Sequence, residues 1–420
     1  MKALYRLLLG VMLVSMAALP VWGAPEDVLK AADEAAENCH AISQKIFEFK
    51  ELGEEEVQSS QLLMEELKKL GYTVTGDLAV PADLMEGGVA KTAFKAELNG
   101  NAPGPAITIM LEYDALPNGH ACGHNLIAAS GMVAASALAK IMPNTPGKVI
   151  VMGTPAEESS SGKIWLLEGK HFEGTDVALI THGSDRWSLD QRLLAIKQAT
   201  FVYKGKASHA AASPEKGISA LDATLLMFHC VDMMREHVRQ DARIHGVIVK
   251  GGERPNIVPD LSQSNFFVRA LDSETMLNIY DRVVNCAKAG EIGTGATLEF
   301  TPPRTMLSSL ITIPELINVM QAALATLGIP EDQVKPAASL ASSDFGNVGS
   351  EYPTVNLWFP VAPEGTALHT DAFREAAASE EGWKGAVLAG KAVALTAYDL
   401  LTHPDKVEAI KAQFQELKAK

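Results

Sequence analysis

Four short hydrophobic runs in this chain are each followed by residues whose side chains can bind a metal ion. The four polar clusters are residues 119–125, residues 155–158, Thr181 with His182, and the segment around His369. An open α/β sheet places its chemistry in the crevice outside the carboxyl ends of its strands. The pattern therefore predicts an α/β fold in which the four clusters converge on a single site.

Strand-like and helical segments alternate along much of the chain. Short apolar runs and helical patterns follow one another at residues 106–114, 126–141, 149–152, 163–168 and 177–181. This alternation predicts a mostly parallel sheet covered by helices on both faces. The residues before the first run, 26–70, carry leucines at helical spacing and are predicted to be helical.

The pattern changes between residues 195 and 304. Its order of strand, helix, strand, strand, helix and strand is that of a split βαβ sandwich. After residue 304 the alternation of strands and helices resumes. The chain has 420 residues, more than the ~250–300 at which a single hydrophobic core stops growing, so two domains are expected. We therefore predict a metal-binding catalytic domain formed by residues 24–194 and 305–420, with residues 195–304 inserted as an α+β lid domain.

The first 23 residues have the features of a signal peptide. Lys2 and Arg6 give a positive start, an apolar core follows at residues 7–19, and small residues precede residue 24. The apolar core is shorter than the ~20 residues that a membrane span needs. We expect cleavage after Gly23, export to the periplasm or out of the cell, and no membrane attachment afterwards. An uncleaved anchor is the alternative.

The charge of the chain argues against nucleic acid as a partner. The net charge is −15 at pH 7, and removal of Lys2 and Arg6 with the signal peptide makes it −17. A surface of this sign repels phosphate backbones, and the sequence contains no basic stripe. We therefore expect no binding to nucleic acid.

The four cysteines do not form the framework of a small disulfide-rich protein. Cys122 lies between two histidines, a setting that suits a thiolate ligand better than a bridge. Of the remaining three, Cys230 and Cys286 could form a disulfide. The alternative is that all three are buried free thiols.

Residues 119–125 contain the densest set of metal-binding side chains. Cys122 and His124 are two positions apart, so they do not share a helix face and can reach one ion only from an irregular loop. A thiolate and an imidazole are ligands that suit zinc, and His120 could be an outer partner. The alternative is a capped turn with a buried cysteine.

Glu157 and Glu158 add what a hydrolytic metal site requires. One carboxylate can bind a metal ion while its neighbour takes a proton from an activated water. Adjacent glutamates usually lie on a solvated surface, but this pair follows a fully apolar run. His182 and His369 also follow apolar runs, although a single histidine is more often structural.

Five of these side chains could together hold two metal ions. They are Cys122, His124, one of the two glutamates, His182 and His369. Asp114, at the end of the first run, would orient a ligand as a neighbouring carboxylate. Its alternative role is to cap the turn before Pro117.

A series of motifs occurs in order over nearly the whole chain after the signal peptide. The segments are EYDALP at 112–117, GHACGHNL at 119–126, TPAEE at 154–158, KASHA at 206–210, GGERPNIVPD at 251–260, SDFGN at 343–347 and LHT at 368–370. They resemble the motifs of the aminoacylase and carboxypeptidase family of dinuclear metallohydrolases. Within that family they are similar to the amidohydrolase branch, which includes aminobenzoyl-glutamate hydrolases, hippurate-type hydrolases and β-alanyl dipeptidases.

The resemblance implies a role for each matching residue. The metal ligands would be Cys122, His124, Glu158, His182 and His369, and the catalytic set would be Glu157 as general base, His209 and Asp114. His209 would reach the active site of the partner subunit in a homodimer and stabilise the oxyanion, and Asn256 would contact the substrate. From the residues alone, His209 and Asn256 would be taken for turn residues.

Three positions depart from the pattern of the family. Asn125 replaces an aspartate of many relatives, as on the aminobenzoyl-glutamate and β-alanyl dipeptidase side of the branch. Glu112 stands where the peptidase side has a metal-binding histidine, so Cys122 has to compensate. Serines replace most of a glycine run after Glu158.

We therefore expect an exported amidohydrolase that cleaves the amide bond of an N-acyl amino acid, such as an aminobenzoyl-glutamate-like compound, or of a small dipeptide. Two divalent ions, zinc or manganese with cobalt or nickel also acceptable, would activate the attacking water. Arg254 or Arg269 could bind a substrate carboxylate, or either could be an ordinary surface residue. The alternatives are an exported non-catalytic metal- or solute-binding protein and a broader metallo-exopeptidase.

Overall fold

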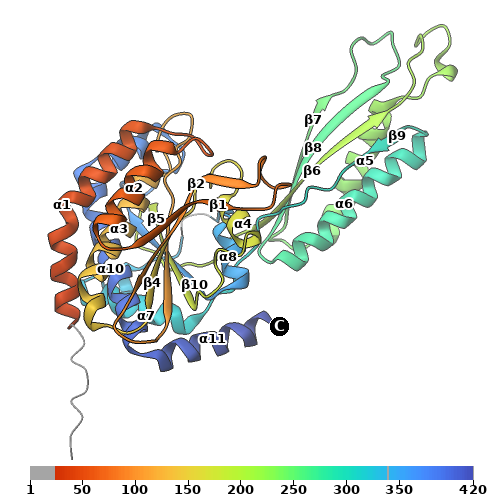
Figure 1. Cartoon of the computed structure of the whole chain (residues 1–420). Helices are drawn as coiled ribbons and strands as arrows, with labels where there is room; N and C mark the ends of the chain where they lie inside the picture. The colour runs from red at the N-terminus through yellow and green to blue at the C-terminus, as the bar shows by residue number, and fades with distance from the viewer. Residues whose placement is uncertain (1–23, 338–339, 420) are drawn as a thin grey trace, which may run out of the picture.

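The structure is a computed structural model that describes residues 24–337 and 340–419. The expected signal peptide at residues 1–23 lies outside the described residues. The described part contains a sheet of six strands and a sheet of four, and each packs against its own helices (Figure 1). The predicted fold class, a mostly parallel α/β sheet with an additional α+β unit, is confirmed.

The six-stranded sheet is parallel where the predicted strands lie. Its strands are β1 Thr73–Ala79, β2 Val89–Asn99, β3 Ala106–Leu111, β4 Lys148–Gly153, β5 Val177–Ser184 and β10 Thr354–Pro360. Their order is β1-β2-β4-β3-β5-β10, and the last four are parallel to their neighbours in that group. β1 and β2 add an antiparallel edge that the sequence pattern did not predict.

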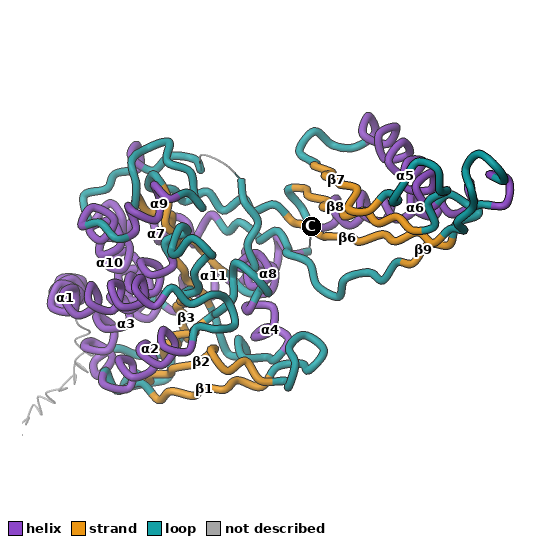
Figure 2. The backbone as a smooth tube through the Cα atoms, turned by 90° about the horizontal axis from the view of Figure 1, so that it is seen from above, coloured by secondary structure: helices purple, strands orange, loops and turns teal. Residues whose placement is uncertain are grey.

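Helices cover both faces of this sheet. They are α1 Pro25–Phe49, α2 Val57–Lys69, α3 His124–Ile141, α4 Gly162–Glu168, α7 Pro314–Thr326, α8 Phe345–Glu351, α9 Asp371–Ala377, α10 Glu380–Thr402 and α11 Pro404–Lys418. α1, α3 and α10 pack together on one face, whereas α4 and α8 lie on the other (Figure 2). Alternate residues of a strand pack against the two helix layers. Val149 and Val151 of β4 face the layer of α1, α3 and α10, and Ile150 and Met152 face the layer of α4 and α8. Burial on both faces is why these strands are continuous apolar runs.

α3 and α10 form the centre of the first helix layer. A Cβ atom at Gly131 of α3 would lie 2.1 Å from Cδ2 of Leu111, so glycine lets the helix approach the sheet closely. By length and composition, the stretches His124–Asn144 and Glu380–Thr402 could each cross a membrane. However, 83% and 67% of their apolar windows are buried inside the protein, as expected for core helices.

The prediction that residues 26–70 are helical throughout is wrong. α1 ends at Phe49 because Lys50 adopts a left-handed conformation with φ 53°, and α2 begins only at Val57. The intervening loop, residues 50–56, lies against the segment that follows β3, where the N–H of Ala115 donates to the carbonyl of Glu51 at 2.7 Å. This contact places the loop next to the carboxyl ends of the parallel strands.

The four-stranded sheet and its two helices occur in the order that the sequence predicts. They are β6 Ala195–Lys204, α5 Ala220–Met234, β7 Arg243–Lys250, β8 Leu261–Ala270, α6 Ser273–Thr294 and β9 Thr297–Glu299. The strands are antiparallel in the order β7-β8-β6-β9, which is the arrangement of a split βαβ sandwich. α5 and α6 cover the face that carries Phe201, Phe266 and Val268, whereas Phe267 on the other face is 42% exposed.

Two segments connect this inserted domain with the rest of the chain, and they are hydrogen-bonded to each other. Ile196 at the start of β6 and Leu307 exchange two backbone hydrogen bonds of 2.9 and 3.0 Å. Arg304, in the returning segment, forms ion pairs with Asp83 at 2.7 Å and Glu168 at 3.3 Å. The two connections therefore form one short two-stranded link.

The four cysteines are free thiols in the structure. Cys39, Cys122 and Cys286 are buried, and Cys230 on α5 is half-buried. Burial and the neighbouring thiol of Cys230 raise the pKa of Cys286 on α6 to about 12. Of the two alternatives for this pair, the structure therefore has the free thiols.

Candidate metal centre

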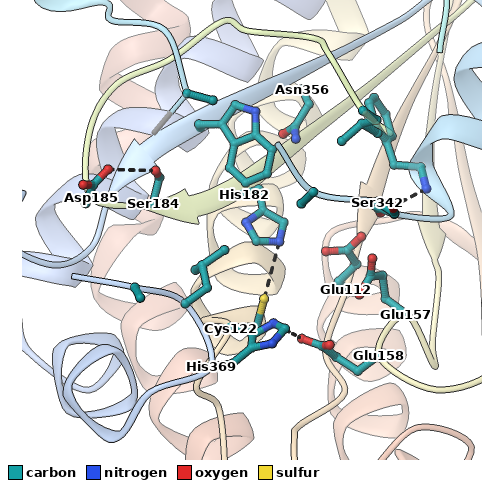
Figure 3. Close-up of a pocket in the computed structure, with 18 of the residues that line it drawn as sticks. Glu112, Cys122, Glu157, Glu158, His182, Ser184, Asp185, Ser342, Asn356 and His369 are labelled. Atoms are coloured by element: carbon teal, nitrogen blue, oxygen red, sulfur yellow. Dashed lines mark hydrogen bonds and ion pairs between the residues drawn. The ribbon is translucent and has the colours of Figure 1, made fainter. Parts of the chain in front are cut away.

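A cavity of about 430 Å³ lies at the carboxyl ends of β3, β4, β5 and β10 (Figure 3). The four polar clusters identified in the sequence meet there because parallel strands end at the same edge of a sheet. The lining residues that can bind metal or transfer a proton include Glu112, Cys122, Glu157, Glu158, His182 and His369, and Asp185 lines the cavity as well. His124 lies directly beside them, at the start of α3.

The first group of potential ligands is Cys122, His124 and His182. Each offers one donor atom, and these atoms all lie within 4.8 Å of one another. Sγ of Cys122 is 3.6 Å from Nε2 of His182, whose Nδ1 contacts the carbonyl of Gly183 at 2.8 Å. Gly123, with φ 78°, turns the chain between the cysteine and the first residue of α3. Because of this turn, the side chains of Cys122 and His124 point to the same place although only one residue separates them.

The second group is Cys122, Glu158 and His369, whose donor atoms also lie within 4.8 Å of one another. Nε2 of His369 is 3.3 Å from Oε1 of Glu158. The N–H of His369 donates to the carbonyl of Ala121 at 2.9 Å, which ties this distant loop to the segment before Cys122. The two groups share the cysteine and therefore form one continuous cluster of five donors.

Asp114 contacts one residue of each donor group. Its Oδ1 contacts Nδ1 of His124 at 2.9 Å, and its Oδ2 accepts the N–H of Glu158 at 2.9 Å. Burial by itself would raise the pKa of Asp114, but His124 holds it below its usual value. The carboxylate thus fixes the imidazole so that Nε2 points into the cluster.

The hydrogen bonding of the cluster is incomplete in the way a metal site requires. Among the described residues, Nε2 of His124 is buried without a hydrogen-bond partner, and the buried Oε1 of Glu158 has the imidazole of His369 at 3.3 Å as an ion-pair contact. Burying a nitrogen such as Nε2 of His124 unpaired is costly, and a bound cation would satisfy it. A donor set of one sulfur, three imidazole nitrogens and a carboxylate fits zinc, and also manganese, cobalt or nickel.

Glu157 lies beside the cluster and has a different environment from Glu158. It lies within 4.8 Å of ligand atoms of His124 and Glu158, and also of Glu112 and Asp344. Burial raises the pKa of Glu157, and the neighbouring carboxylates raise it further. A high pKa makes Glu157 the stronger proton acceptor of the two glutamates.

Lys163 and Asp344, for which the sequence predicted no role, are buried next to Glu157 and Glu112. Nζ of Lys163 is 2.7 Å from Oε1 of Glu112 and 2.6 Å from Oδ1 of Asp344, and all three side chains are buried. Burial would lower the pKa of Lys163, but the two carboxylates raise it. The signals available were a single cation in an apolar helix and an aspartate in the SDFGN motif. Neither indicates that the two side chains meet.

Three predicted residues lie outside this cavity. His209, Arg254 and Asn256 are exposed on loops of the inserted domain, and none of them lines the cavity of its own chain. Nδ1 of His209 accepts the N–H groups of Ala211 and Ala212 at 3.2 Å, which orients the imidazole. Within one chain, His209, the residue expected to bind the oxyanion, therefore lies away from the cluster of metal-binding donors.

Arg269 is the arginine of the inserted domain that reaches the cavity wall. Its Nη1 donates to Oγ of Ser342, a lining residue, at 3.4 Å. Its Nε is buried and has no hydrogen-bond partner. Of the two arginines considered for a substrate carboxylate, Arg269 has the closer position.

The fold, the inserted domain and this cluster are features of metal-dependent hydrolases of amide bonds, and comparison with known proteins places the chain in that class. The chain belongs to the peptidase family M20/M25/M40, whose sequence profile matches residues 109–385. The resemblance inferred from the motifs is therefore confirmed, and the protein is an enzyme of the hydrolase class.

Two relatives and one solved structure illustrate the extent of the similarity. The "Xaa-Arg dipeptidase" of Mus musculus is 34% identical over 400 residues, which cover 91% of this chain and 90% of that protein. A p-aminobenzoyl-glutamate hydrolase chain of Escherichia coli (strain K12) is 28% identical over 452 residues, covering 90% and 92%. A dinuclear metal binding peptidase of the M20 family from Bacillus subtilis shares the fold, with a TM-score of 0.67, 21% identity, and coverage of 87% and 99%.

Proposed function

We propose that this protein uses two divalent metal ions to hydrolyse the amide bond of an N-acyl amino acid or a small dipeptide. The observation that carries the proposal is the pair of donor groups that share Cys122, with Glu157 beside them. The names of the mouse and E. coli relatives, a dipeptidase and an aminobenzoyl-glutamate hydrolase, support this substrate class. Zinc or manganese fits the donor set best.

Each residue of the site would have a separate role in the reaction. Cys122, His124, Glu158, His182 and His369 would hold the ions, which polarise the amide carbonyl and acidify a water when bound. Glu157 would take the proton of that water and return it to the leaving amine.

We propose further that the protein is a homodimer in which His209 acts on the active site of the partner subunit. The imidazole is exposed, held by two backbone N–H groups, and outside the cavity of its own chain. There it would stabilise the negative charge that develops on the carbonyl oxygen. The exposed side chains of Val247 and Phe267, on the strands of the inserted domain, support an interface in this domain.

A substrate carboxylate would bind to the inserted domain. Arg269 is the better candidate than Arg254 because its guanidinium reaches the cavity wall and has a buried N–H without a partner. Asn256 would contact the substrate from the loop next to His209, since its carbonyl accepts the N–H of Ala210 at 3.0 Å. Export is also proposed, and it rests on the N-terminal sequence alone.

The test combines elemental analysis with a hydrolysis screen. The purified protein should contain about two divalent ions per chain, and it should release free amine from some members of a panel of N-acyl amino acids and dipeptides. Chelation should abolish the activity, and zinc or manganese should restore it. Metal binding without turnover of any member of the panel would count against this substrate class, and cleavage of longer peptides would favour a broader exopeptidase.

A further inference from the structure

The turn that delivers Glu157 to the cavity contains a strained residue. Ala156, directly before Glu157, has φ 60° and is completely buried. A residue with a side chain adopts this left-handed conformation at a cost, and it persists only where the surroundings enforce it. The position of Glu157 therefore depends on whatever holds Ala156.

Glu56 is the side chain that holds it. Oε1 of Glu56 accepts the N–H of Ala156 at 2.7 Å, and Oε2 accepts the hydroxyl of Thr92 at 2.9 Å. The carboxylate is completely buried, so water does not compete for either hydrogen bond. A second buried carboxylate, that of Asp114, accepts the N–H of Glu158. The backbone is thus held on both sides of Glu157.

Glu56 is itself fixed by the loop of residues 50–56. The carboxylate of Glu51 accepts the N–H groups of Gln58 and Ser59 at 2.8 Å each, which anchors the loop to the start of α2. At Gly53 the loop touches the turn: a Cβ there would lie 2.1 Å from Oγ of Ser159 and 3.0 Å from Cα of Ala156. The loop that carries Glu56 is therefore packed against the turn and held in place.

We propose that Glu56 is a positioning residue for the general base, because it maintains the left-handed turn that points Glu157 at the cavity. This role rests on the proposed function, in which Glu157 is the general base. The hydrogen bonds of the Glu56 side chain go to Ala156 and Thr92, neither of which is a proposed metal ligand. Removal of the Glu56 side chain should therefore lower the rate of the chemical step and leave the metal site loaded.

The experiment compares Glu56→Ala with Glu55→Ala, a change at an exposed neighbour in the same loop. E56A should lower kcat about 10- to 100-fold, as expected when a catalytic group is displaced by about 1 Å, with little change in KM or metal content. E55A should behave as the wild type. Glu56→Gln should keep most of the activity because its amide oxygen can still accept the N–H of Ala156.

A double variant separates positioning from general stability. Glycine adopts a positive φ without strain, so Ala156→Gly in the E56A background should recover much of the lost kcat. Should E56A fail to fold, Thr92→Val removes one of the two partners of Glu56 and should give a smaller loss of kcat. Wild-type kcat in folded, metal-loaded E56A would overturn the proposal. So would a loss that A156G leaves unchanged. An inactive wild-type enzyme would instead contradict the proposed function.

Discussion

Nζ of Lys163 lies 2.7 Å from Oε1 of Glu112, and both side chains are buried behind the metal ligands. The same ammonium group is 2.6 Å from Asp344. Lys163 is therefore the counter-charge that these two buried carboxylates share, and Glu112 also lies 3.7 Å from Nε2 of His124 in the donor cluster.

The first prediction concerns this ion pair. Lys163→Met would leave two buried carboxylates without a counter-charge, so the free energy of unfolding should fall by about 3–5 kcal/mol. Urea unfolding of the metal-free proteins measures it. Lys170→Met, at an exposed lysine, is the matched control and should change stability by less than about 1 kcal/mol. Equal effects of the two substitutions would contradict the assigned role of Lys163.

The second prediction concerns the general base. Glu157→Gln keeps the shape of the side chain but cannot accept the proton, so kcat should fall by about 10²–10⁴-fold. Elemental analysis should find the same metal content as in the wild type. Glu168→Gln, on the surface at the end of α4, is the control and should be fully active. An E157Q variant with normal turnover would show that another group is the base.

The third prediction concerns metal binding. His124→Ala removes a ligand and should lose at least one of the two ions. Asp114→Asn weakens the support of that ligand and should lower metal affinity about 10- to 100-fold. Titration against a competing chelator measures both, with the exposed His237→Ala as control. Unchanged metal content in H124A would remove His124 from the site.

The fourth prediction concerns the partner subunit. Glu157→Gln and His209→Ala should each be nearly inactive. Mixed and reassembled in equal amounts, they should regain about a quarter of the wild-type activity, because half of the dimers then contain one complete site. If His209 acted within its own chain, the mixture would stay inactive. Analytical ultracentrifugation of the mixture tests the dimer independently.

The fifth prediction concerns pH. The hydrogen-bonded Arg186 holds the pKa of Asp185 at about 2, below the ~3.9 expected in the unfolded chain. Because the folded pKa is the lower one, this stabilisation is present above about pH 4 and is lost as the pH falls towards 2. Asp185→Asn should therefore cost about 1–2 kcal/mol at pH 7 and almost nothing near pH 2. Denaturant titrations at pH 7 and near pH 2 measure this difference, with Asp332→Asn, at an exposed aspartate, as the matched substitution.

The convergence of the polar clusters was predictable because it follows from strand direction. Residues that come after parallel apolar runs reach the same edge of the sheet, whatever their separation in the sequence. This brings Cys122 and His369 into one donor group. The antiparallel edge was not predictable in the same way, since Gly76 and Asp77 interrupt β1 with a register shift and a positive φ of 51°.

Contacts between distant buried charges could not be predicted. Lys163 and Asp344 are 181 positions apart, and nothing near either residue indicates its partner. The same holds for Glu56, which the sequence pattern placed inside a continuous helix. Its side chain meets Ala156 because helix α1 ends at Phe49 and the following residues form a loop. Such pairs depend on how separate segments pack, and local periodicity carries no information about it.

The two connections to the inserted domain meet at the paired residues Ile196 and Leu307, so a rotation of that domain would take place about this link. All five proposed metal ligands lie outside the inserted domain, whereas His209 and Asn256 lie within it, away from this link. A rotation of the inserted domain would change the entrance of the cavity and the contacts with the substrate, while the distances among the five metal ligands would stay the same. Substitutions within the inserted domain can therefore change what the enzyme accepts without changing how it holds its ions.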